Sequence, residues 1–118
     1  MPRYLSLIRI DENDSPEGGP SPELMRRMGE LIEEMTKAGV LLDTAGLHPT
    51  AQGTRVHYEG GQLSVTDGPF TESKEVIGGY ALMQAKDKAE AIEWTKRFLK
   101  VHEEHWTVTS EVREIVEH

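Results

Sequence analysis

Residues 76–85, VIGGYALMQA, form the most apolar stretch of the chain and decide its fold. A short, nearly continuous apolar run is typical of a strand buried inside a sheet, so we expect a central strand here. The Gly78–Gly79 pair removes side chains from the middle of this strand. Such a gap indicates that a ligand, or the backbone of a second chain, approaches closely.

Alternating and turn-bounded segments on both sides of this run predict further strands. Two of them surround Gly60–Gly61 and are expected to pair as a hairpin. The predicted strands are 3–10, 40–47, 54–58, 62–66 and 105–117. Residues 11–22, DENDSPEGGPSP, are rich in acids, Gly and Pro and predict a long surface loop.

Two helices are expected between the strands. Ser21 followed by Pro22 is a typical helix start, and Gly39 is a typical end. Asp87 with Glu90 indicates a capping box at the start of a second helix. The buried stripe of the first helix is assigned to Leu24, Met28, Leu31, Ile32 and Met35, and that of the second to Ala89, Ile92, Trp94 or Thr95, and Phe98 or Leu99.

The order strand, helix, strand, hairpin, strand, helix, strand predicts a single α+β domain over residues 1–118. Two helices cannot cover both faces of the sheet, so we expect both on one face of an antiparallel sheet, as in a ferredoxin-like sandwich. The other sheet face then needs cover. A second copy of the chain would supply it, which predicts a homodimer.

Composition excludes several classes of function. The chain has 118 residues and no cysteine, so disulfides, thiolate metal sites and cysteine nucleophiles are absent. A formal charge of −8 disfavours nucleic acid, and the basic residues at 26–27 and 96–100 have the acidic neighbours of solvated helix faces. No segment has the pattern of a signal peptide or a membrane helix, so we expect a soluble, cytoplasmic protein without membrane contact.

The stretch 66–75, TDGPFTESKE, has two interpretations. Asp67 before Gly68–Pro69 is typical of a tight turn in which the carboxylate accepts backbone hydrogen bonds. The charged residues that follow, Glu72 and Lys74 among them, favour a functional role for the same aspartate. The alternative interpretation of these charged residues is a short exposed helical turn that is capped by Thr71.

His48 is the candidate partner of Asp67. It ends the strand at 40–47 and precedes Pro49, so it is expected at the mouth of a loop. Histidine suits proton transfer at neutral pH, and a nearby carboxylate would orient its ring. The alternative is a surface histidine bonded to a backbone carbonyl. His57, on the polar face of its strand, is expected to be exposed, and VHEEHW at 101–106 lacks the spacing of a zinc site, so we expect no metal.

GVLLDTAGLHPT at 39–50, TRVHYEGGQLSVTDGPFTESKEVIGGYALMQA at 54–85 and AIEW at 91–94 together resemble the YCII-related family, and more closely its branch named for the DGPF motif. The resemblance extends from Tyr4 to Val116. It implies a dimeric α/β-barrel built from ferredoxin-like protomers. Many such proteins are encoded beside extracytoplasmic-function sigma factors, and more distant relatives on this fold include isomerases, dehydrochlorinases and oxygenases.

The resemblance also implies a site. A His–Asp pair in a cleft is the proposed active site of the broader family. Asp67 matches the aspartate. The family's histidine lies early in the first helix, where this chain has none, and His48 is the local substitute.

Two functions from different classes remain open. The first is a small enzyme in which His48 and Asp67 perform acid–base chemistry, an isomerisation or elimination, on a small organic substrate. No nucleophile elbow, Walker loop or dinucleotide fingerprint is present, so no cofactor is expected. The second is a ligand-binding or regulatory module that engages a partner such as a sigma factor. The residues expected to bind the small molecule are Arg55, Phe70, Glu72, Lys74 and Tyr80.

Overall fold

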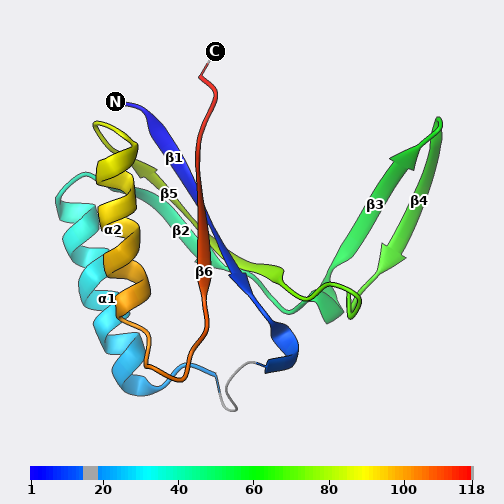
Figure 1. The fold of residues 1–118 in the computed structure, drawn as a ribbon, viewed down its shortest axis with the longest axis horizontal. Helices are drawn as coiled ribbons and strands as arrows, with labels where there is room; N and C mark the ends of the chain where they lie inside the picture. Colours follow the sequence, from blue (N-terminus) through cyan, green and yellow to red (C-terminus); the bar gives the residue numbers. More distant parts are fainter. Residues whose placement is uncertain (15–18, 118) are drawn as a thin grey trace.

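The computed structural model describes residues 1–14 and 19–117, in which a four-stranded antiparallel sheet carries two helices and a separate two-stranded hairpin extends away (Figure 1). The strand order of the main sheet is β2-β5-β1-β6. Residues 15–18 of the predicted loop lie outside the described part. The elements are β1 (Arg3–Ile10), η1 (Glu12–Asp14), α1 (Pro22–Lys37), β2 (Leu41–Gly46), η2 (Thr50–Gln52), β3 (Thr54–Glu59), β4 (Gln62–Asp67), β5 (Val76–Gln84), α2 (Lys88–Lys100) and β6 (Thr109–Glu114).

The apolar run at 76–85 is confirmed as a central strand. β5 pairs antiparallel with β1 on one side and with β2 on the other. A Cβ built on Gly79 would lie 2.9 Å from the carbonyl oxygen of Ala45, and one on Gly78 would lie 2.8 Å from Cδ1 of Ile10. The room made by the two glycines is therefore used by Ile10 of β1 and by the backbone of β2.

Both helices begin where the sequence predicts. The Ser21 hydroxyl accepts a hydrogen bond from Leu24 N at 3.0 Å, and the Asp87 carboxylate accepts one from Glu90 N at 2.9 Å. Gly39 takes the left-handed conformation, φ 75°, just after α1. None of the described helices is long and apolar enough to cross a membrane.

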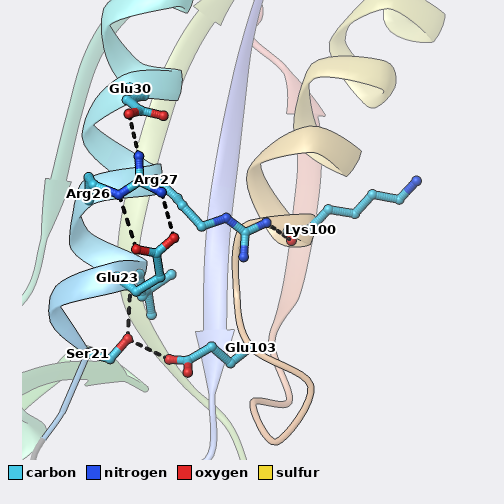
Figure 2. A network of polar contacts seen from close by, with 8 residues as sticks. Ser21, Glu23, Arg26, Arg27, Glu30, Lys100 and Glu103 are labelled. Carbon is cyan, nitrogen blue, oxygen red and sulfur yellow. Dashed lines mark hydrogen bonds and ion pairs between the residues drawn. The ribbon is translucent and has the colours of Figure 1, made fainter.

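Arg26 and Arg97 of the helices form ion pairs with acidic neighbours, as expected. Figure 2 shows Arg26 between Glu23 and Glu30, and Arg27 donating to the carbonyl oxygen of Lys100 at 3.3 Å, which ties α1 to the end of α2. The Ser21 hydroxyl that caps α1 also donates to Glu103 at 2.7 Å. These contacts are typical of a solvated helix surface.

The core lies between the helices and one face of the main sheet. Its buried side chains come from β1, both helices and β5, and the stripe of α1 is confirmed at Leu24, Leu31 and Met35. Trp94 and Phe98 of α2 pack against this core, but Ala89 is exposed. That assignment was wrong because Ala89 lies in the first turn, and the buried positions of α2, Ala91 and Thr95, start two residues later.

None of the described helices lies on the opposite face of the main sheet (Figure 1). Side chains alternate along a strand, so the buried Tyr4–Met83 pair marks the helix side and the Leu5–Leu82 and Leu7–Tyr80 pairs mark the other. These four residues are only partly buried. We call this surface the open face.

The predicted hairpin is confirmed, and β3 and β4 form a two-stranded sheet that is separate from the main sheet (Figure 1). One strand prediction needs correction. The closing strand is shorter than predicted, because Trp106 N bonds to the carbonyl oxygen of Glu103 at 3.0 Å in a turn before β6. Dimerisation remains a prediction.

Candidate functional site

The two segments that carry His48 and Asp67 are joined by hydrogen bonds. The Thr50 hydroxyl donates to Glu12 at 2.5 Å and accepts a hydrogen bond from Phe70 N at 3.2 Å. Thr50 N also donates to Glu12, at 2.8 Å, and Gly68 N bonds to the carbonyl oxygen of Gly53 at 2.9 Å. We call the joined segments, residues 47–53 and 67–70, the loop junction.

The loop junction depends on a glycine. A Cβ built on Gly68 would lie only 1.7 Å from the carbonyl oxygen of Thr50, so no other residue fits without a backbone shift. The Gly68–Pro69 peptide bond is cis. Phe70, which follows, is buried. The turn interpretation of Gly68–Pro69 is therefore well supported by the packing.

Asp67 is exposed at the end of β4, opposite the first residue of β3. Its carboxylate accepts a hydrogen bond from the hydroxyl of Thr54 across the hairpin at 2.9 Å. The turn interpretation expected backbone N–H donors further along the chain, and the partner is a side chain instead. The carboxylate thus ties together the two ends of the hairpin.

His48 is exposed on the loop after β2. Within the part of the chain that is described, no hydrogen bond or ion pair joins it to Asp67. The segments meet through Thr50 and Gly68. The acid–base role of this pair stays a prediction.

Arg55 is exposed, but its guanidinium is held by contacts with its own chain. Its guanidinium donates to Glu72 at 2.6 Å and to the Ser73 hydroxyl at 3.1 Å. Its Cζ lies 3.8 Å from the centre of the Phe70 ring, a cation–π contact. Two cations are among the residues expected to bind the small molecule. Arg55 already has a carboxylate partner, whereas Lys74 is exposed on the loop between β4 and β5.

Tyr80 contacts a residue that sequence reasoning missed. Its hydroxyl donates to Oδ2 of Asp43 at 2.7 Å, next to the open face. This hydrogen bond, together with partial desolvation, raises the pKa of the Tyr80 phenol above its usual value of 10.0. The signal in the sequence was an aspartate inside the otherwise apolar strand VLLDTAGL.

The remaining histidines take structural or surface positions. His57 is exposed, as expected. Its Nε2 lies 3.3 Å from Oε2 of Glu59. His102 bonds to the carbonyl oxygen of Leu99 and packs edge-on against Phe98 and Trp106. Among residues 1–14 and 19–117, no group of three or more side chains is arranged to hold a metal ion.

Comparison with known proteins agrees with this architecture. The model of the YCII-related domain matches residues 3–116. An uncharacterised protein of Rhizobium meliloti (strain 1021) is 30% identical over 73 residues, which is 62% of this chain. The match spans 59% of that relative's length, less than two thirds. Since the family model covers nearly the whole chain, the protein belongs to the YCII-related family.

Proposed function

We propose that the loop junction binds a small organic molecule and that His48 and Asp67 exchange protons with it. The observation that supports this is the attachment through Thr50, which links the loop of His48 to both Glu12 and Phe70 N. A general acid or base has to be held in place by its surroundings, and this attachment restrains both loops.

The chemistry of the junction suits proton transfer without a nucleophile. His48 offers an imidazole, the side chain that most often serves as a general acid or base, and Asp67 offers a carboxylate that accepts a hydrogen bond from Thr54. Lys74 is the cation open to an anionic group of the substrate, because Arg55 is already paired with Glu72. We expect isomerisation or elimination of a small enol, lactone or halogenated compound.

The test follows proton exchange and does not require the substrate to be known in advance. The protein is incubated in D₂O with a panel of small enols, lactones and haloaromatic acids, and deuterium incorporation is followed by ¹H NMR. Exchange should be catalytic for one class and fall at least 100-fold in His48→Gln, as expected for loss of an acid–base group. Asp67→Asn should also lower it.

The control is His57→Gln, which removes an exposed histidine on the neighbouring hairpin. Its exchange rate should equal that of the wild type. Full activity in His48→Gln, or no exchange with any class, would contradict the acid–base proposal.

One observation favours a second candidate function. The hairpin carries exposed apolar side chains, Val56 and Leu63 among them, and exposed apolar patches mark interaction sites. Under this alternative the protein is a binding or regulatory module, and its charge of −8 suits a basic partner such as a sigma factor. Binding of a small molecule without any proton exchange would favour it.

A further inference from the structure

The guanidinium of Arg55 has an aromatic support and two polar partners, all from the segment that follows β4. Its Cζ lies 3.8 Å from the centre of the Phe70 ring. Its Nη1 donates to Oε1 of Glu72 at 2.6 Å, and its Nη2 donates to the Ser73 hydroxyl at 3.1 Å. The ring positions the guanidinium, and the two hydrogen bonds occupy its terminal nitrogens.

The support of Arg55 is fixed, whereas the groups on its nitrogens belong to an exposed loop. Phe70 is buried, and its N–H donates to the Thr50 hydroxyl of the loop junction. The side chain of Glu72 is 68% exposed, and residues 71–75 form neither helix nor strand. Displacing Glu72 therefore breaks one exposed ion pair, a kind of contact that adds little to stability.

Glu72 does not use the full binding capacity of the guanidinium. A guanidinium binds a carboxylate best through two parallel hydrogen bonds from two of its nitrogens. Within the described part of the chain, the Glu72 carboxylate accepts a hydrogen bond from Nη1 alone, and the neutral Ser73 hydroxyl takes the second nitrogen. A free carboxylate can replace both contacts with one charge-assisted pair.

We propose that Arg55 is a carboxylate-binding residue of the loop junction, and that Glu72 occupies it until a small carboxylic acid takes its place. The carboxylate of the ligand bonds to Nη1 and Nη2, while the Phe70 ring continues to support the guanidinium. Glu72 and Ser73 then separate from the hairpin. The proposal rests on the proposed function only in placing the ligand at the loop junction, and it does not require proton transfer by His48 and Asp67.

Lys74 has a different part in this arrangement. It is exposed two residues after Glu72 and forms no ion pair with any described residue. Its ammonium attracts an incoming anion, but it is a point charge on a flexible stem and cannot form the two-point pair of a guanidinium. Arg55, which is held against Phe70, is the residue that fixes the orientation of the carboxylate.

Glu72 competes with the ligand because the chain holds it beside Arg55. A group that is tethered by a short flexible segment has an effective concentration of about a millimolar or more. Removing the Glu72 carboxylate should therefore tighten the binding of a free carboxylate. Partial unfolding of a variant weakens binding, so a gain in affinity cannot come from loss of the fold.

The first measurement is an NMR titration of the full chain with benzoate at constant ionic strength. The dissociation constant should fall by about fivefold or more in Glu72→Gln, with large shifts at the Arg55 Nε–H and the Ser73 amide. Glu59→Gln removes the same charge from the hairpin and should leave the constant within about twofold.

Three results of this titration would overturn the proposal. The first is equal affinity of the wild type and Glu72→Gln. The second is the absence of saturable benzoate binding to Glu72→Gln, in which Arg55 has lost its competitor. The third is equal binding of benzamide, which has the same ring and no charge.

The second measurement asks whether the two-point geometry of Arg55, rather than its charge, holds the ligand. In the Glu72→Gln background, Arg55→Lys keeps the charge and should weaken benzoate binding by about fivefold or more. Arg113→Gln removes an exposed arginine of β6 and should have no effect. Native ¹⁵N shifts of β3 and β4 show that the hairpin stays folded. Full affinity in Arg55→Lys, or loss of affinity in Lys74→Gln alone, would overturn the proposal.

The third measurement separates this proposal from the acid–base function. Benzoate has no acidic C–H group, so its binding reports on Arg55 without any proton exchange. Benzoate binding at Arg55 with no exchange for any substrate class would contradict the acid–base function and support this proposal. Exchange of a carboxylate substrate with unchanged kcat and KM in Arg55→Gln would overturn this proposal and leave the acid–base function standing.

Discussion

The carbonyl oxygen of Thr50 occupies the space in which a side chain of residue 68 would lie. A Cβ built on Gly68 would come within 1.7 Å of that oxygen, and within 2.7 Å of the carbon that carries it. Both atoms are backbone, so the clash cannot be relieved by turning a side chain. The DGPF turn and the segment after β2 are therefore packed as one unit.

Gly68→Ala should destabilise the protein by about 2 kcal/mol or more, because the backbone of the loop junction has to move. Gly46→Ala is the matched control: Gly46 has no atom within 4 Å of an added Cβ and no positive φ. It should be neutral or stabilising by up to about 1 kcal/mol. Urea unfolding at one protein concentration measures both, and equal midpoints would refute the packing argument.

Thr50→Val keeps the shape of the side chain and removes its hydroxyl. Glu12 then loses a donor and Phe70 N loses its acceptor, which should cost about 1–3 kcal/mol. Hydrogen exchange of the Phe70 amide should accelerate in parallel. Thr54→Val, which breaks only the exposed contact with Asp67, should cost less than about 0.5 kcal/mol. An unchanged Phe70 amide would show that Thr50 does not hold the loop.

Asp43→Asn should lower the pKa of Tyr80 toward its usual value, since the hydrogen bond to Asp43 is the main cause of the raised pKa. The folded chain binds this proton more tightly than the unfolded chain. The stabilisation is therefore complete below pH 10 and is lost as pH rises through the raised pKa. Titration of the Tyr80 ¹³Cζ signal measures the shift. Glu114→Gln, beside Tyr4, should leave it unchanged.

Arg97→Gln should raise the pKa of Glu34. The hydrogen bonds from Arg97 of α2 hold the pKa of this carboxyl on α1 below 4.5, so the pair, which is about half exposed and therefore screened by solvent, contributes modestly to the helix contact above that pH. The contribution is lost as pH falls through the lowered pKa. A ¹³C titration of Glu34 tests this, with Lys96→Gln as control because Lys96 pairs within α2. If both variants titrate like the wild type, the pairing is absent in solution.

Apart from the closing strand, the bounds of the predicted helices and strands followed from the sequence to within a residue or two. The caps at Ser21 and Asp87, the end at Gly39 and the turn at Gly60–Gly61 depend on short-range hydrogen bonds and on positive φ angles, which neighbouring residues specify. The packing of both helices on one face of an antiparallel sheet followed from the order and number of the elements. The central position of β5 followed from its nearly continuous apolar run.

Contacts between distant residues were not predictable in this way. The Glu12–Thr50 bond joins residues 38 apart in the chain, and Tyr80–Asp43 joins residues 37 apart. Periodicity says which face of a strand is apolar, but not which surface will cover it. For this reason the sequence did not show that the β3–β4 hairpin forms a separate sheet, and His48 was placed beside Asp67 on the basis of loop order alone.

The sequence by itself determined the secondary structure, the α+β class and the position of the DGPF turn, because each depends on neighbours along the chain. Only the tertiary structure decided that the hairpin forms a separate sheet and that Thr50, rather than His48, contacts the DGPF turn. These depend on how rigid elements meet in space, where one backbone oxygen against Gly68 selects among loop arrangements that the sequence pattern allows equally.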